Sequence, residues 1–397
     1  MLIKRIFSFF MSLLMSVFGL VSGISDNAKN QIQTVNSVQQ LDDNVYMLDF
    51  NGDYDIDGLL EQGVSSVTDI VSFVADRSPY DVKDFKIGSD EGGGCSTFEA
   101  YTPEGDHTLG RNFDFKEAPC FVLWTHPEGH YASVSVIDTN FMLYGTYIHH
   151  YSRLSAIQSL LAPYFCVDGI NEKGLAIAVL QIRADATSQI DQTKPDITTT
   201  TMIRAVLDTC ANVDEAVEFL KSHNMHDSLF CAYHYQIIDK DRSVVAEYIN
   251  NELHIYEENS TDYSVNGSIY EDDDISYQYV TNYSVTKDIG SYEIEQHGED
   301  RAEAIAQVLK EKNGVLTEAQ SMDLLSFVKL NYQHPKYPWK IVALWSAVYN
   351  SDKCTLKLAA NTDYSKVYTF SVDKPCRVLS TEDISVSEYT LREWNYL

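Results

Sequence analysis

Cys95 is the residue of this chain whose type and surroundings could provide a nucleophile. It follows the flexible run Gly92-Gly93-Gly94 and begins a stretch typical of a β-strand, and Arg111 and Asp114 follow it by 16 and 19 residues. A thiol needs a base and a stabilised thiolate. If cleavage made Cys95 the first residue of a chain, its α-amino group, with a pKa of about 7.7–8.0, would be that base. The arrangement indicates an N-terminal cysteine nucleophile, although a lone cysteine at a strand start is otherwise an ordinary buried residue.

Residues 94–114 resemble the choloylglycine hydrolase family of N-terminal-nucleophile amidases, which includes bile salt hydrolases and penicillin V acylases. In that family a strand begins with the catalytic cysteine, and the returning strand carries the pattern G-R-N-x-D. The run GRNFD at residues 110–114 keeps this pattern and both spacings. The run DGINEKGL at residues 168–175 is similar to a second hairpin of the family. The resemblance covers about residues 95–360 and implies hydrolysis of a linear amide.

The resemblance assigns roles to residues around Cys95. Arg111 would hold positive charge beside the thiolate, and Asp114 would orient the α-amino group by accepting its hydrogen bonds. Asn282 would donate its side-chain N–H to the oxyanion, an interaction worth roughly 3 kcal/mol. Arg301 would balance charge or hold a substrate carboxylate. Each of these two residues also has an alternative without a catalytic role: Asn282 could only end a strand, and Arg301 could form an ordinary ion pair at the start of a helix.

Gln181 departs from the family pattern. Bile salt hydrolases carry an asparagine near the oxyanion at the equivalent place, on the strand after the N-E-K-G turn. Glutamine can donate the same N–H from a longer arm, so we expect Gln181 to share the oxyanion role. The difference leaves the family's bile-salt specificity open for this chain.

The residues before Cys95 require a cleavage step. Lys4 and Arg5 precede an apolar run at residues 6–20 and a small residue, Gly23, which is the pattern of a secretory signal peptide. We expect a signal peptide at 1–23, a propeptide at 24–94 and an amidase domain at 95–397, in a secreted or extracytoplasmic protein. An uncleaved membrane anchor is the alternative. Since glycines allow strained backbone, self-cleavage of the Gly94–Cys95 bond by an N-to-S acyl shift is our hypothesis for maturation.

The composition excludes other classes of function. A formal net charge of -29 argues against a nucleic-acid partner. Residues 53–64 begin like a calcium loop but end in Val64 rather than a bidentate glutamate. The two pairs of neighbouring histidines, His149 with His150 and His223 with His226, lack a third zinc ligand. We therefore expect no metal and no cofactor. The chain has 7 cysteines, an odd number, so at least one thiol is unpaired within the monomer.

The hydrophobic pattern predicts an α+β domain in which strands form hairpins and helices come in pairs. The resemblance implies the four-layer αββα sandwich of N-terminal-nucleophile hydrolases, with two antiparallel sheets between helix layers. Expected strands lie at residues 45–50, 95–101, 108–115, 121–124, 131–137, 164–167, 175–182, 233–238, 244–249, 341–349 and 355–360. Expected helices lie at residues 59–74, 199–209, 213–222, 301–310 and 318–328.

The function we expect is hydrolysis of a small amide through a thioester to Cys95. Candidate substrates are an N-acyl amino acid, a conjugated bile salt or a penicillin-like compound. Two alternatives stay open: an acyltransferase that passes the acyl group to an amine, and an exported binding protein that kept the fold and lost the activity. The oligomeric state also stays open, a homo-oligomer included.

Overall fold

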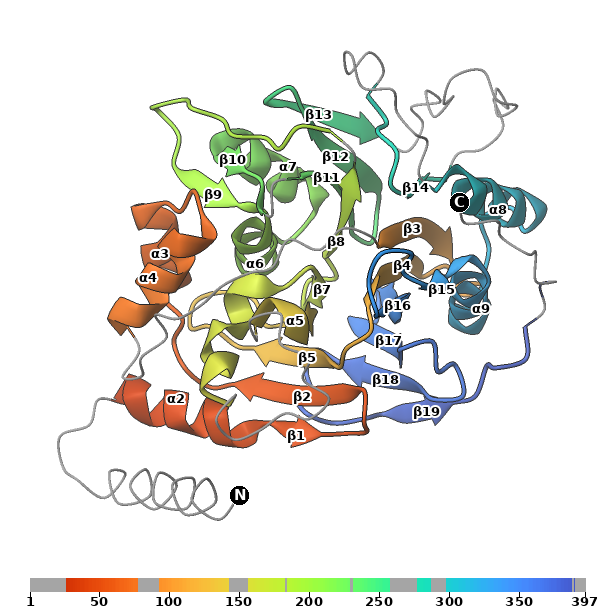
Figure 1. The fold of residues 1–397 in the computed structure, drawn as a ribbon, viewed down its shortest axis with the longest axis horizontal. Coiled ribbons are helices and arrows are strands. Elements are labelled where there is room, and N and C mark those ends of the chain that lie inside the picture. The colour runs from red at the N-terminus through yellow and green to blue at the C-terminus, as the bar shows by residue number, and fades with distance from the viewer. Residues whose placement is uncertain are drawn as a thin grey trace.

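Two large β-sheets pack against each other, and helices cover their outer faces (Figure 1). The computed structural model describes residues 26–77, 93–142, 156–182, 184–228, 231–257, 277–286, 298–387 and 389. The expected signal peptide at 1–23 lies outside these residues. Across the described ranges, no helix is long and apolar enough to cross a membrane.

The first sheet has nine strands within the described residues, and all its neighbours are antiparallel except β2 and β5, which are parallel. In spatial order the strands are β1 (Gln39–Gln40), β2 (Val45–Phe50), β5 (Cys120–Thr125), β6 (Ser133–Asp138), β7 (Asp168–Asn171), β8 (Ala176–Ile182), β11 (Ala232–Ile238), β12 (Ser243–Ile249) and β13 (Glu252–Glu257). Most positions of β5 to β12 are buried on both faces, because helices cover one face and the second sheet covers the other.

The second sheet has eight strands within the described residues. In spatial order they are β14 (Tyr279–Val280), β3 (Gly94–Tyr101), β4 (His107–Lys116), β16 (Lys340–Asn350), β17 (Thr355–Ala360), β18 (Val367–Ser371) and β19 (Ser380–Glu382), and β15 (Asn331–Gln333) also pairs with β16. A separate parallel pair is formed by β9 (Asp196–Thr198) and β10 (Asn224–His226).

The helices form the outer layers. Helices α6 (Thr199–Thr209) and α7 (Val213–Ser222) contact β7, β8, β11 and β12 of the first sheet. Helices α8 (Glu299–Glu311) and α9 (Glu318–Val328) contact β3, β4, β14 and β16 of the second sheet (Figure 1). The remaining helices are α2 (Asp26–Ser37), α3 (Ile56–Gln62), α4 (Val67–Arg77), α5 (Thr139–Met142) and the 3₁₀ helix η1 (Ala156–Phe165). This layering confirms the predicted α+β, αββα fold.

The segment before Cys95 is part of this architecture. Strand β2 pairs with β5 along all six of its residues, so that residues 45–50 continue the first sheet. Apolar side chains of the segment are buried in the common core, among them Leu48, Leu59 and Phe73. Tyr54 donates a hydrogen bond from its hydroxyl to Asp208 Oδ2 on α6 at 2.8 Å. The sequence-based boundary at residue 95 therefore falls inside the sandwich, and sheet pairing crosses it.

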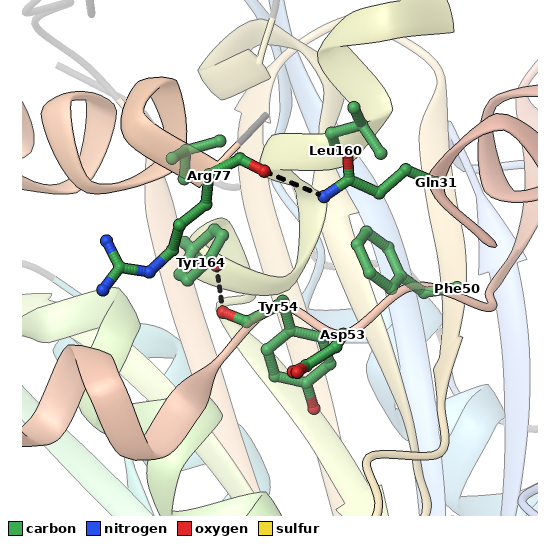
Figure 2. Close-up of a pocket in the computed structure, with 8 residues that line it drawn as sticks. Gln31, Phe50, Asp53, Tyr54, Arg77, Leu160 and Tyr164 are labelled. Carbon is green, nitrogen blue, oxygen red and sulfur yellow. Dashed lines mark hydrogen bonds between the residues drawn. The ribbon is translucent and has the colours of Figure 1, made fainter. Parts of the chain in front are cut away.

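A small pocket marks where this segment meets η1 (Figure 2). Its lining residues come from the segment, except for Leu160 and Tyr164 of η1. Tyr164 donates its hydroxyl proton to the carbonyl oxygen of Tyr54, and Gln31 Nε2 donates to the carbonyl of Arg77 at 3.4 Å. None of the residues that line this pocket belongs to the candidate catalytic set.

Three expectations about elements need correction. The helix expected at 59–74 is two helices, α3 and α4, because Gly63 adopts a φ of 71° and ends α3. The strand expected at 164–167 is wrong, because η1 continues to Phe165 and the strand that follows, β7, begins only at Asp168. The polar stretch before residue 43, for which no element was expected, contains α2, whose packing against β2 and η1 outweighs its weak apolar pattern.

Candidate active site

The hairpin of β3 and β4 sets the geometry around Cys95. Its register pairs Cys95 with Phe113, Thr97 with Arg111 and Gly94 with Asp114. Since directly opposed residues share a face and successive residues alternate, Cys95 and Arg111 lie on one face of the sheet and Asp114 lies on the other. The local spacing of 16 and 19 residues thus places one charged side chain on each side of the Cys95 backbone.

Arg111 is fully buried between the two sheets. Its Nε donates to Asp168 Oδ2 on β7 at 3.1 Å, and Nη1 donates to the carbonyl of Asn112 at 2.9 Å. Burial alone would lower the pKa of Arg111, but the Cys95 sulfur and the Asp168 carboxylate raise it overall. Among the described residues Nη2 has no hydrogen-bond acceptor, so it keeps donor capacity for a thiolate.

The contact of Asp168 with Arg111 was not predicted from the sequence. The Asp168 carboxylate accepts hydrogen bonds from Arg111 Nε, from Trp345 Nε1 at 2.9 Å and from the Tyr349 hydroxyl at 2.6 Å. The carboxylate is fully buried, and a buried charge of this kind requires such partners. Asp168 opens the DGINEKGL run, so the signal was present, but its partner Arg111 lies 57 residues away.

Asp114 lies on the helix side of the same hairpin and is almost fully buried. Its Oδ1 accepts the backbone N–H of Leu330 at 3.0 Å, and Oδ2 lies 3.8 Å from Arg301 Nη1. Burial raises the pKa of Asp114 to about 6, against the opposing effects of Arg301 and the Leu330 N–H. No hydrogen-bond donor among the described residues reaches Oδ2, so this oxygen can accept a new donor.

Asn282 and Arg301 meet at the backbone of Cys95. The Cys95 N–H donates to Asn282 Oδ1 at 2.6 Å. Arg301 Nη2 donates to the same oxygen at 2.8 Å, while Nη1 donates to the Cys95 carbonyl at 2.5 Å and to Ser96 Oγ at 2.8 Å. Asn282 and Arg301, whose places in the sequence rest on looser context, therefore lie in one buried cluster around Cys95.

Gln181 reaches this cluster through its backbone. Its carbonyl oxygen accepts a hydrogen bond from Asn282 Nδ2 at 2.7 Å. Its side chain is exposed, unlike the other side chains of β8. The oxyanion role of the Gln181 side chain stays a prediction, because Gln181 contacts Asn282 through its main-chain carbonyl and not through its side chain.

The two glycines before Cys95 serve different geometric needs. Gly93 has a φ of 132°, which side chains rarely tolerate. At Gly94 the need is space, because an added Cβ would lie 2.7 Å from Leu330 Cδ1 and 3.1 Å from Arg301 Nη2. The Gly94–Cys95 bond thus passes between the charged cluster and the helix layer with no room for a side chain before Cys95.

All seven cysteines are free thiols. Burial raises the pKa of Cys120 well above its usual range and that of Cys166 to about 12, which makes them poor nucleophiles. Among the described residues, no group of three or more histidine, cysteine or acidic side chains is arranged to hold a metal ion. Cys95 lies beside two buried arginines, Arg111 and Arg301.

A family model described as linear amide C–N hydrolases of the choloylglycine hydrolase family matches residues 95–297. Two solved structures of variants of conjugated bile acid hydrolase from Clostridium perfringens are similar in fold. They have 13% sequence identity and TM-scores of 0.50 and 0.51, and each comparison covers 76% of this chain and 97% of the other. Penicillin V acylase from Agrobacterium tumefaciens is similar over 70% of this chain and 87% of its own, with 15% identity and a TM-score of 0.44. No curated protein matches the chain in sequence.

Proposed function

Because the chain belongs to the choloylglycine hydrolase family, whose members hydrolyse linear amide C–N bonds, we propose that it is an exported precursor activated by cleavage between Gly94 and Cys95. The family makes the chain a hydrolase of linear amides. The proposal adds the nucleophile, Cys95, and the event that activates it. In the mature enzyme Cys95 would be the first residue of its chain.

The observation that carries the proposal is the environment of the Cys95 nitrogen. In the uncleaved chain it is an amide that donates to Asn282 Oδ1 at 2.6 Å. An amide nitrogen cannot accept a proton from the thiol, whereas an amine can. The unused Oδ2 of Asp114, on the strand paired with Gly94, is an acceptor for the additional N–H bonds that cleavage would create. This unused acceptor supports the proposal that the Cys95 nitrogen becomes an α-amino group.

The catalytic cycle follows from these contacts. The α-amine takes the thiol proton, and the sulfur attacks the substrate carbonyl carbon. Asn282 Nδ2 carries two N–H bonds, of which one goes to the Gln181 carbonyl. The second would donate to the oxyanion of the tetrahedral intermediate. The amine product leaves with the proton from the α-ammonium, and water then hydrolyses the thioester.

Self-cleavage can use the same sulfur. The thiol attacks the Gly94 carbonyl carbon, the C–N bond to Cys95 breaks, and the thiol proton is transferred to the nitrogen, which becomes the α-amine. Water then hydrolyses the thioester and regenerates the thiol with a Gly94 carboxylate. Leu330 and Arg301 approach Gly94 so closely that no Cβ would fit there, and this supports the step, because it keeps the bond beside the catalytic cluster.

Intact-mass measurement and N-terminal sequencing of the purified protein test the proposal. Wild type should mature to a chain that begins at Cys95, and activity should rise in step with cleavage. Cys95→Ala should accumulate uncut precursor, whereas Cys231→Ala, which removes a half-buried thiol elsewhere, should mature normally. A fully active wild type that retains a peptide bond before Cys95 would refute the mechanism.

Substrate class is tested on the same mature enzyme. A glycine-conjugated bile salt, penicillin V and a long-chain N-acyl glycine represent the three candidate groups. An added amine that captures the acyl group in preference to water would favour the acyltransferase alternative. An intact Gly94–Cys95 bond with no acyl-enzyme would favour the inactive binding protein. Export is tested separately, by finding the mature protein outside the cytoplasm.

A further inference from the structure

A buried pair on the first sheet, His234 and Glu247, contacts the loop that carries Asn282. His234 lies on β11 and Glu247 lies on β12, and the two residues are directly paired across these strands. Both side chains are fully buried. Opposed residues of an antiparallel pair project from the same face, so the two side chains act on the loop together.

Glu247 binds the part of the loop that follows Asn282. Its Oε1 accepts the Ser284 hydroxyl at 2.5 Å and the Thr286 N–H at 3.1 Å, and its Oε2 accepts the Val285 N–H at 2.8 Å. Burial alone would raise the pKa of Glu247, but the neighbouring His234 ring and the hydrogen bonds from the loop donors lower it overall. An ionised carboxylate with several donors forms the stronger kind of hydrogen bond.

His234 binds the residue just before Asn282. Its Nε2 lies 2.8 Å from the carbonyl oxygen of Thr281, which can only accept, so Nε2 carries the proton of this bond. Its Nδ1 lies 3.6 Å from Glu247 Oε2. The two side chains thus form contacts on either side of Asn282, at positions 281 and 284–286.

Asn282 has little regular structure of its own to hold it. It follows β14, which is only two residues long and pairs with β3. Sheet pairing therefore ends before Asn282, although its amide must be aimed at the atom that reacts. An oxyanion donor is effective only when it is held in place before the reaction.

We propose that His234 and Glu247 are positioning residues: they fix residues 281–286 so that Asn282 Nδ2 is directed at the oxyanion. The inference rests on the proposed function, since it takes Asn282 as the oxyanion donor. Neither side chain is assigned contact with substrate. Their effect on catalysis passes through Asn282.

A double-mutant cycle between Glu247→Gln and Asn282→Ala tests this proposal. We measure kcat on whichever of the three probe amides the wild type hydrolyses fastest, per chain shown by intact mass to begin at Cys95. We also measure alkylation of Cys95 by iodoacetamide, a reaction that needs the thiolate but forms no oxyanion.

Asn282→Ala should lower kcat by about 10²–10³, and Glu247→Gln should lower it by about tenfold with KM little changed. The double variant should be no slower than Asn282→Ala alone. Alkylation should stay within about twofold of wild type for Glu247→Gln. Glu252→Gln, which changes an exposed glutamate on the adjacent strand β13, is the control and should behave as wild type. His234→Gln and the milder Ser284→Ala should lower kcat in the same direction.

Independent, additive losses in the double variant, or alkylation slowed as much as hydrolysis, would overturn the positioning role. Normal turnover in Glu247→Gln beside a slow Asn282→Ala would overturn this inference alone. Normal turnover in Asn282→Ala would instead remove the oxyanion assignment in the proposed function, and with it this inference. If Glu247→Gln does not fold, Ser284→Ala decides by the same criteria.

Discussion

Arg111 and Asp114 lie on opposite faces of strand β4, three residues apart, with Cys95 on the neighbouring strand between them. Arg111 extends into the space between the sheets, where it binds Asp168. Asp114 extends toward the helix layer, where it binds the Leu330 N–H and faces Arg301. We therefore expect the two charges to act on different atoms of Cys95: Arg111 on the sulfur, which raises the pKa of this arginine, and Asp114 on the backbone nitrogen that cleavage would free.

Arg111→Lys should reduce activity much more than folding. Lysine keeps the charge but loses the planar fork with which Arg111 binds Asp168 and faces the sulfur. We expect kcat to fall by at least about tenfold, on the order of 1.4 kcal/mol in activation free energy. Arg242→Lys, at an arginine bonded to Glu257 near the surface, is the control. Near-normal turnover of a correctly matured Arg111→Lys enzyme would reduce Arg111 to a structural residue.

The pH profile of kcat/KM should have one ascending limb, from deprotonation of the α-amino group of Cys95, near its usual pKa of about 7.7–8.0 and shifted by the surrounding charges. No histidine is required as the base. We expect His107→Gln and His234→Gln to leave the position of this limb unchanged, even where His234→Gln lowers kcat. Loss of the limb in a folded, mature histidine variant would identify that histidine as the base instead.

The uncleaved precursor should lose stability as the pH rises through about 6. Burial raises the pKa of Asp114 from 3.8 to about 6, so between these values the folded state binds more protons than the unfolded state. The contribution of Asp114 is fully present below about pH 4 and is lost above pH 6, a change of roughly 3 kcal/mol.

This contribution is measured by urea unfolding of Cys95→Ala and Cys95→Ala/Asp114→Asn between pH 4 and 7. The difference between their unfolding free energies should change over the pH window given by Asp114. Cys95→Ala/Asp76→Asn, which removes an exposed carboxylate, should match Cys95→Ala throughout. Parallel pH curves for the Asp114 pair would contradict the assignment.

The fragment that ends at Gly94 should remain bound after cleavage. Its β2 supplies a sheet neighbour to β5, and its loss would leave β5 as an unpaired edge and expose core side chains such as Leu48 and Phe73. Each such side chain contributes about 1.5–3 kcal/mol when buried. Polar contacts such as Tyr54 to Asp208 add to the interface.

Native mass spectrometry of the mature enzyme should therefore detect both chains in one complex, which denaturant separates into two. The uncut Cys95→Ala precursor should elute at the same volume as this complex in gel filtration. An active enzyme that has released the fragment in native buffer would contradict this expectation and favour a removable propeptide.

Local sequence determined the parts of the fold that depend on near neighbours. Helices α6, α7 and α9 have the bounds expected from the sequence, and Asn212 caps α7 by accepting the Glu215 N–H, a contact between residues three apart. The spacing of Arg111 and Asp114 from Cys95 corresponds to a hairpin register, which a short turn fixes.

Tertiary structure decided the contacts that join distant positions. Asp168 meets Arg111 across the two sheets, and Glu247 meets the Asn282 loop across 37 residues or more. The parallel pairing of β2 with β5 could not be predicted from the hydrophobic pattern either. The local periodicity of a sequence indicates a strand but does not indicate its partner strand. The local spacing therefore indicated a candidate nucleophile, Cys95, and the hairpin that carries it. The residues that contact Arg111 and the Asn282 loop follow only from the folded chain. Folding buries charged groups, and a buried charge needs a bonded partner that the sequence does not identify.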